Sequence, residues 1–295
     1  YKKLIEKNGA AKMQEVYDLL KEKHLLEEHT ATKAAIFETY ETLKPYFEEF
    51  YANRPKRRYV DFNQGIDSRL ITDENMAKLA EIPIRPVRIA FDHWSLRKEY
   101  EKAVRTAVRH GHTNLSNYIL YNFDDKPVEL YWRLKLNVEL CEELNASIYS
   151  FPMKYHPIED PDYFSNRDYV GKYWNRKFIR TIQAILNSTK GKVGKGHDFF
   201  CKAFGSNEEE FYKLLYMPEA MIIYRFYFEG IGMTEKWWKD FNSLTEKEMR
   251  VIRPIIERND FSNIERQTDN ANVLRVLQYY CITREDAEQV RDEHK

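Results

Sequence analysis

The sequence contains 295 residues, of which 43% are hydrophobic and 32% charged, which suits one or two globular domains with a sizeable core. Basic and acidic residues number 47 each, so the basic excess typical of general nucleic-acid binders is missing, and nucleic acid is not indicated as a partner. No apolar run approaches the roughly 20 residues needed to cross a bilayer, so no membrane association is expected.

The three cysteines lie far apart in the sequence, at Cys141, Cys201 and Cys281. They form neither a CxxC pair nor a disulfide framework, which favours a reducing compartment. We therefore expect a cytoplasmic protein. The chain begins at Tyr1 and not at methionine, which suggests a piece of a longer protein.

Residues 1–57 are predicted to form a helical N-terminal segment. Apolar positions between Met13 and Leu20 share one helical face. A second helix is expected from about Thr32 to Ala52, with Pro45 predicted to kink or restart it.

Residues 58–158 contain a repeat of apolar runs and helical patterns. The apolar runs recur about thirty residues apart, the size of a strand–helix unit, at Tyr59–Phe62, Val87–Phe91, Tyr118–Tyr121 and Ser147–Phe151. Helical patterns lie between them, at Asp73–Glu81, Leu96–His110 and Pro127–Leu144.

This alternation predicts the α/β class, with parallel strands covered by helices on both faces and arranged as a partial (β/α) barrel. Residues 159–295 are then expected to form a mainly helical C-terminal domain, through which the chain could recruit a partner protein.

Polar residues gather where each expected strand ends. They are Asp61, Asn63 and Gln64, then Asp92 and His93, then Asn122, Asp124 and Asp125, then Ser150, Lys154, Tyr155 and His156. In parallel α/β folds, ligands and catalytic groups lie at the carboxyl ends of the strands. The structural alternative is that Asp, Asn and Ser cap the helices that follow.

Two long polar side chains favour the functional interpretation. Gln64 is a poor capping residue, and Arg88 interrupts an apolar strand. A guanidinium at that position needs an inward-facing carboxylate or a ligand as its partner. Asp67 lies at the same strand-to-helix corner as Gln64 and is a further candidate.

A hydrolytic metal site is an alternative for the same region. Asp92 and His93, together with Asp67 and Asp124, could in principle bind a divalent metal at a barrel mouth. Such a site would be rich in carboxylates and poor in imidazoles.

Four segments resemble the later strand–helix units of radical S-adenosylmethionine (radical SAM) enzymes. They are Asp61-Phe-Asn-Gln-Gly-Ile-Asp-Ser-Arg-Leu70, Arg88-Ile-Ala-Phe-Asp-His93, Asn117-Tyr-Ile-Leu-Tyr-Asn-Phe-Asp-Asp125 and Ile148-Tyr-Ser-Phe-Pro-Met-Lys-Tyr155. The resemblance implies a (β/α) barrel, a [4Fe–4S] cluster and S-adenosylmethionine cleaved to a 5′-deoxyadenosyl radical.

The resemblance also implies roles for the strand-end residues. Asn63, Gln64 and Arg88 would contact the ribose, carboxylate or amino group of S-adenosylmethionine, and Asp67 belongs to the same expected binding set. The remaining candidates, which would flank the cofactor or reach the substrate, are Asp92, Asn122 and Asp124. Tyr121 or Tyr149 could stack on the cofactor or donate a hydrogen bond to it. The substrate and the catalytic residues stay open.

The chain departs from the family at the cluster. Family members hold it with a CxxxCxxC loop, which is missing from this sequence. The chain is therefore expected to be part of an enzyme whose cluster ligands lie on a missing or separate segment. The alternatives are a cluster-less homologue that acts as a binding or scaffold module, and a similarity to generic strand–helix units only.

Overall fold

The computed structural model describes residues 13–51, 58–159 and 168–293. The chain forms two compact units, Tyr1–Arg58 and Tyr59–Lys295. The parts of the expected N-terminal helices that fall on residues 1–12 and on Ala52 lie outside the described ranges. In the described ranges, no helix is both long enough and apolar enough to cross a membrane.

The first unit contains two helices, α2 (Gln14–Glu22) and α3 (Lys33–Tyr51), and both were expected. They pack around a small core that includes Val16, Leu20 and Leu43. The helix α3 continues through Pro45 and does not restart there.

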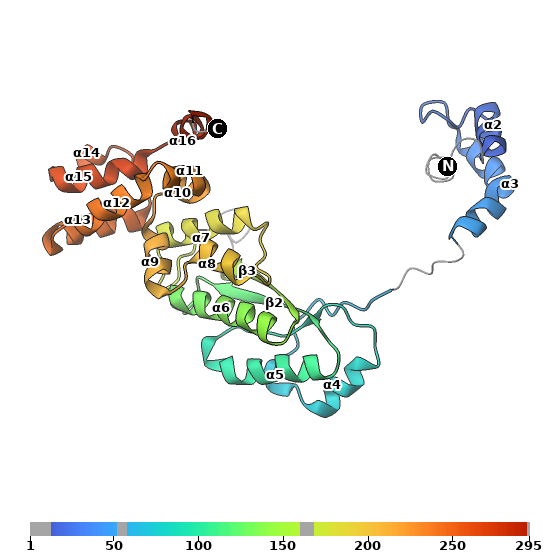
Figure 1. The fold of residues 1–295 in the computed structure, drawn as a ribbon, viewed down its shortest axis with the longest axis horizontal. Helices are drawn as coiled ribbons and strands as arrows, with labels where there is room; N and C mark the ends of the chain where they lie inside the picture. The colour runs from blue at the N-terminus through green and yellow to red at the C-terminus, as the bar shows by residue number, and fades with distance from the viewer. Residues whose placement is uncertain (1–12, 52–57, 160–167, 294–295) are drawn as a thin grey trace. The chain divides into compact units, whose positions relative to one another are not determined.

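The second unit is built on a parallel sheet of three strands in the order β1 (Val87–Arg88), β2 (Asn114–Tyr121) and β3 (Ser147–Lys154). The helices α5 (Arg97–Arg109) and α6 (Pro127–Glu143) connect consecutive strands, as Figure 1 shows. The α/β class and the parallel arrangement are thus confirmed, whereas a barrel is not shown.

Local sequence signals explain the helix boundaries in this unit. The helix α4 (Asp73–Ala80) begins at a capping box in which Thr72 and Asn75 bond each other's backbone amides. The helix α6 has Pro127 in its first turn, where a missing backbone amide costs nothing. A short 3₁₀ helix, η2 (Trp94–Leu96), leads into α5.

The prediction of a strand at Tyr59–Phe62 is wrong. Only Val60 and Ile66 pair with the neighbouring segment, as single parallel bridges to Ile84 and Ile89. The step from 60 to 66 is six positions and the step from 84 to 89 is five, so regular pairing cannot run unbroken from one bridge to the other. The polar residues between the two bridges leave the ladder, and the 3₁₀ helix η1 (Ser68–Leu70) follows.

Only one face of the sheet carries a helical layer among the described residues. Leu115, Ile119 and Ile148 on that face are at most 1% exposed. Their neighbours in the strands point the other way, where Tyr149 is 37% and Met153 is 49% exposed. The expectation that both faces are covered is therefore wrong, and we call this second side the open face of the sheet.

The rest of the second unit is helical, as expected for its C-terminal part. The elements are α7 (Arg176–Ser188), α8 (His197–Phe204), α9 (Glu208–Tyr216), α10 (Glu219–Ile223), α11 (Arg225–Gly230), α12 (Met233–Asn242), α13 (Glu246–Arg258), α14 (Ile264–Gln267), α15 (Ala271–Leu277), η3 (Gln278–Cys281) and α16 (Arg284–Glu293).

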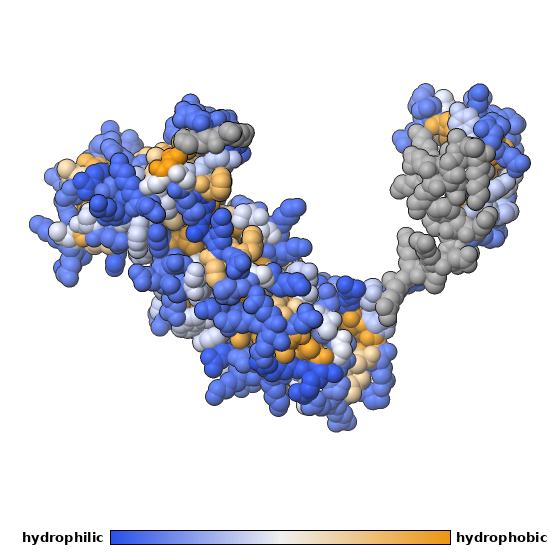
Figure 2. All heavy atoms as spheres, viewed as in Figure 1, coloured by the Kyte–Doolittle hydropathy of each residue, from blue (hydrophilic) through white to orange (hydrophobic). Residues whose placement is uncertain are grey.

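These helices share one hydrophobic core with the sheet. Ile119 of β2 and Leu134 of α6 belong to the same buried cluster as Ile182 of α7 and Ile252 of α13. The face of the molecule that Figure 2 shows is mainly hydrophilic, with separate apolar patches. Sheet and helices therefore form a single compact body in residues 59–295.

Candidate ligand-binding site

Arg88 lies on the open face of the sheet and is paired with Asp61. The Nε and Nη2 atoms of Arg88 donate to the two carboxylate oxygens of Asp61, each at 3.1 Å. This two-point pairing raises the pKa of Arg88, so its charge persists. Two kinds of partner were considered for Arg88, an inward-facing carboxylate and a ligand. The structure shows a carboxylate, that of Asp61, which was not among the expected cofactor-binding residues.

The pair differs in exposure, which leaves one side of it accessible. The side chain of Arg88 is 11% exposed and that of Asp61 is 48% exposed. A third contact fixes the guanidinium, because Nη1 of Arg88 donates to Ser116 Oγ at 3.1 Å. The result is a rigid cation beside an accessible carboxylate.

Aromatic rings extend from this pair across the open face. The guanidinium of Arg88 lies 5.3 Å from the centre of the Tyr118 ring, which is 5.8 Å from the ring of Phe151. Tyr149 lies in register with Ser116, and its ring is covered in part by Lys192 at 5.4 Å. The open face thus combines an ion pair with flat apolar surface.

Asn63 and Gln64 are exposed and lie in the segment between the Val60 and Ile66 bridges. Within the described part of the chain, neither side chain has a hydrogen-bond partner, so both amides are accessible. They come from the same polar segment as Asp61.

Asp67 has a local structural partner. Its carboxylate accepts from the backbone nitrogen of Arg69 at 2.9 Å and from Nη2 of Arg69 at 2.6 Å. These hydrogen bonds lower the pKa of Asp67 to about 2. The side chain caps η1, which corresponds to the structural alternative for this residue.

Asn122 is fully buried, and its side chain forms hydrogen bonds with other parts of the protein. Its Oδ1 accepts from the backbone nitrogen of Gly171 at 2.9 Å, and its Nδ2 donates to the carbonyl of Tyr169 at 3.1 Å. The backbone of Asn122 is left-handed, with φ of 69°. Asn122 therefore holds the segment before α7 against the end of β2 and does not face solvent.

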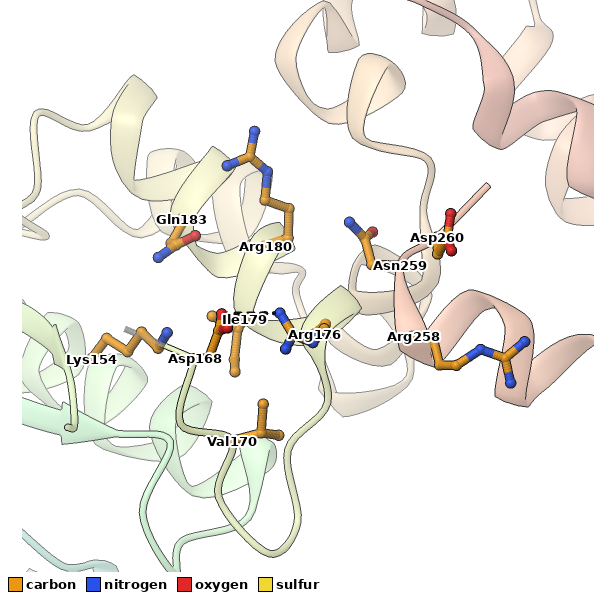
Figure 3. Close-up of a pocket in the computed structure, with 10 residues that line it drawn as sticks. All are labelled: Lys154, Asp168, Val170, Arg176, Ile179, Arg180, Gln183, Arg258, Asn259 and Asp260. Atoms are coloured by element: carbon orange, nitrogen blue, oxygen red, sulfur yellow. Dashed lines mark hydrogen bonds and ion pairs between the residues drawn. The ribbon is translucent and has the colours of Figure 1, made fainter. Parts of the chain in front are cut away.

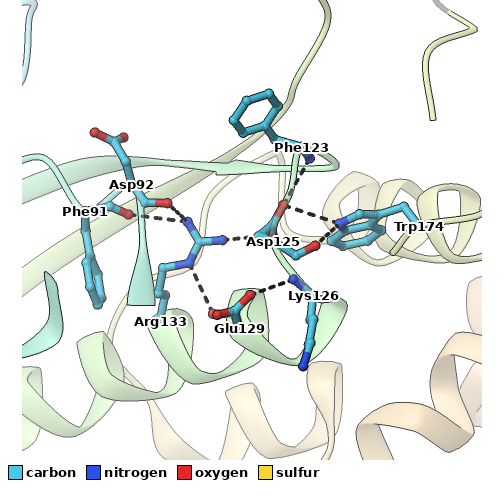
Figure 4. A network of polar contacts seen from close by, with 8 residues as sticks. All are labelled: Phe91, Asp92, Phe123, Asp125, Lys126, Glu129, Arg133 and Trp174. Atoms are coloured by element: carbon cyan, nitrogen blue, oxygen red, sulfur yellow. Dashed lines mark hydrogen bonds and ion pairs between the residues drawn. The ribbon is translucent and has the colours of Figure 1, made fainter. Parts of the chain in front are cut away.

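Asp92 and Asp124 carry exposed carboxylates. The part of Asp92 that is engaged is its carbonyl, which accepts from Nη1 of Arg133 at 2.8 Å. Figure 4 shows the Asp92 carboxylate directed away from this contact. The carboxylates of Asp92 and Asp124 are thus accessible near the carboxyl ends of the strands. They do not take part in the Arg88–Asp61 pair.

The polar network in Figure 4 was not predicted as a unit. Arg133 of α6 donates to Asp125 Oδ2 at 3.1 Å, and Asp125 Oδ1 accepts from the Phe123 backbone nitrogen at 3.0 Å. The indole of Trp174 donates to the Asp125 carbonyl at 2.9 Å. The sequence does contain one indication of this network. Arg133 lies in an apolar stretch of α6, and like Arg88 it therefore needs a polar partner.

The described residues contain no group of three His, Cys, Asp or Glu side chains that could hold a metal ion. Cys141 is buried, Cys201 is half-buried and Cys281 is exposed. These three thiols therefore do not fit a [4Fe–4S] cluster. The side chains considered for a hydrolytic metal do not form a ligand group either.

No family model matches the chain, and no match is found among curated proteins or solved structures.

Proposed function

We propose that the open face of the sheet binds S-adenosylmethionine, as part of a partial (β/α) barrel of the radical SAM type. The observation that supports this best is the Arg88–Asp61 pair beside the Tyr118 ring. An α-amino acid is a zwitterion, and a fixed guanidinium next to an accessible carboxylate offers one partner for each of its charges.

In this arrangement the α-carboxylate of the cofactor accepts from Arg88 and its α-ammonium donates to Asp61. The adenine packs on the aromatic surface that includes Tyr118 and Phe151, since planar rings stack favourably on one another. Asn63 and Gln64 each offer an amide with donors and acceptors for the ribose hydroxyls.

The strand arrangement supports the same proposal. The order β1-β2-β3 with helical crossovers directs the carboxyl ends of all three strands to one edge. Ligands of parallel α/β folds bind at such an edge. Arg88 is the last residue of β1, whereas its register partner Ser116 lies near the start of β2, so the rule supports the Arg88 end of the site only. The paired bridges at Val60 and Ile66 add a fourth segment in the same direction.

Bound S-adenosylmethionine supplies an activated sulfonium, and radical cleavage would require a [4Fe–4S] cluster with ligands outside this sequence. Cys141, Cys201 and Cys281 do not supply those ligands. The role proposed for the residues of this chain is to bind and orient the cofactor.

Isothermal titration tests the proposal with the chain alone. S-Adenosylmethionine is expected to bind at least about tenfold more tightly than adenosine, because adenosine lacks the amino-acid group that pairs with Arg88 and Asp61. Arg88→Gln should remove this difference. Arg105→Gln is the matched control, since Arg105 pairs with Glu143 between α5 and α6, away from the open face.

Equal binding of the two compounds to the wild type, or an unchanged difference in Arg88→Gln, would refute the assignment. Far-ultraviolet circular dichroism checks that the variants fold. If the wild type binds no S-adenosylmethionine, the alternative of a binding or scaffold module is favoured for this chain.

A further inference from the structure

A long cleft runs along α7 in the second unit, apart from the open face of the sheet. Its first part has a volume of about 730 Å³ and is lined by Arg176, Arg180 and Gln183 of α7, together with Lys154 and Asn259. Its second part has a volume of about 740 Å³. Arg180 and Asn259 line both parts, so the two cavities adjoin.

The two parts differ in chemistry. The first contains the cations Lys154, Arg176, Arg180 and Arg258, with the carboxylates of Asp168 and Asp260 (Figure 3). The second is lined mainly by uncharged and apolar side chains, among them Ala184, Ile223, Phe261 and Ile282. Polarity therefore falls along α7 from Arg176 toward Ser188.

The arginines of the first part retain donors for a ligand. Arg176 contacts Asp168 through Nη1 at 3.2 Å, and Arg180 contacts Glu219 through Nε at 2.8 Å. Within the described residues these are their hydrogen bonds, which leaves other guanidinium nitrogens of both side chains unused. The two arginines are one helical turn apart, so they face the same side of α7.

The unused guanidinium donors of the polar part favour an anion. They belong to Arg176 and Arg180, each of which has one carboxylate partner. Guanidinium groups bind phosphate and carboxylate oxygens with good geometry. The amides of Gln183 and Asn259 add donors beside the arginines.

We propose that this cleft binds an anionic amphiphile, with its charged group at Arg176 and Arg180 and its apolar chain along Ile223, Phe261 and Ile282. The combined volume exceeds what a single small anion needs and suits an elongated ligand. This site does not depend on S-adenosylmethionine binding, because it uses different residues.

The probes are octyl phosphate, inorganic phosphate and octanol, titrated into the full chain below the concentration at which octyl phosphate forms micelles. Octyl phosphate is expected to bind at least about tenfold more tightly than inorganic phosphate or octanol, because only octyl phosphate contacts both parts of the cleft. Comparison with inorganic phosphate separates an amphiphile from a free phosphate ligand.

Two variants assign the halves of the site. The double variant Arg176→Gln/Arg180→Gln should weaken octyl phosphate about tenfold and leave octanol unchanged. Ile223→Ser should reduce the advantage of octyl phosphate over inorganic phosphate, and because Ile223 is 54% exposed, its replacement leaves the core intact. Circular dichroism verifies folding of both variants.

Arg250→Gln is the control for nonspecific charge, since Arg250 lies on α13 with its side chain 83% exposed and is not part of the cleft lining. It should bind octyl phosphate as the wild type does. Equal affinity of the wild type for octyl phosphate and inorganic phosphate would overturn the proposal. So would full affinity in the double arginine variant, or a loss in Arg250→Gln as large as in that variant.

Discussion

Arg133 and Asp125 form a buried ion pair, with 3.1 Å between Nη2 of Arg133 and Oδ2 of Asp125. The Arg133 side chain is 0% exposed and that of Asp125 is 7% exposed. The same guanidinium donates to the carbonyls of Phe91 and Asp92 (Figure 4). One side chain of α6 thus fixes two strand-end loops, the loops that carry the exposed carboxylates of Asp92 and Asp124.

Arg133→Met is expected to destabilise the second unit by about 3–5 kcal/mol, because it leaves the Asp125 carboxylate buried without its cation. Burial raises the pKa of Asp125 even with Arg133 present, which shows that the charged form of this carboxylate is already disfavoured in the folded protein. Urea unfolding measures the loss. Arg105→Met removes an ion pair to the exposed Glu143 and should cost less than about 1 kcal/mol. Similar losses in the two variants would contradict this explanation.

Asn122→Ala should destabilise the protein more than Asn122→Gly does. Both changes remove the hydrogen bonds to Gly171 and Tyr169, at a cost of about 1–3 kcal/mol. Alanine adds about 1–2 kcal/mol because the φ of 69° is unfavourable for a residue with a Cβ atom. Asn145→Gly is the control, because Asn145 is exposed with φ of 47° and should tolerate glycine. Equal thermal midpoints for the two Asn122 variants would argue against the backbone effect.

Lys177 is expected to make stability depend on pH. Its Nζ donates to Thr181 Oγ1 at 2.7 Å and to the Met217 carbonyl at 2.5 Å, and burial lowers its pKa to about 7. In the unfolded chain the pKa is about 10.4. Between these values the unfolded state binds more protons, so the free energy of unfolding rises with pH.

The comparison with Lys177→Met isolates this effect. Between about pH 7 and pH 9, the stability of the wild type relative to the variant should rise by at most about 1.4 kcal/mol per pH unit. Below about pH 7 the cost of the buried charge is fully present, and the difference should level off. Urea unfolding at several pH values measures it. A difference that stays flat from pH 6 to pH 9 would show that Lys177 keeps its ordinary pKa.

A buried hydrogen-bonded chain links α5, the sheet and α6. Asn117 Nδ2 donates to the Tyr100 hydroxyl at 2.7 Å, the hydroxyl donates to Asn137 Oδ1 at 2.8 Å, and Asn137 Nδ2 donates to Ser150 Oγ at 2.7 Å. Burial raises the pKa of Tyr100 far above its ordinary value.

Tyr100→Phe should therefore cost about 1–3 kcal/mol, because it leaves the Asn117 Nδ2 donor and the Asn137 Oδ1 acceptor buried without the hydroxyl they share. Tyr216→Phe should cost less, since the partner of that hydroxyl is Glu257, which water can reach. Chemical denaturation compares the two variants. A larger loss in Tyr216→Phe would show that the buried chain contributes little.

The sequence by itself determined the local elements. Helical periodicity and capping signals such as Thr72 and Pro127 predicted α4, α5 and α6 to within one or two residues, because helices depend on contacts between residues close in the chain. The apolar runs about thirty residues apart predicted the three parallel strands, because the helical patterns between them supply the crossovers that parallel strands require. The position of Arg88 in an apolar run predicted that its guanidinium needs a partner, either a carboxylate or a ligand.

Only the tertiary structure decided which side chains meet and which face of the sheet stays open. Strand alternation assigns residues to two faces but does not say which face a helix covers, and that left Tyr149 and Met153 exposed. The register mismatch opposite Ile84–Ile89 removed the first expected strand. In the sequence, Asn122 and Asp67 were candidates of the same kind as Asn63 and Gln64. In the structure, Asn122 accepts a hydrogen bond from Gly171 and Asp67 accepts one from Arg69. Hydrogen bonds and ion pairs of this kind depend on three-dimensional proximity, which a one-dimensional pattern does not contain.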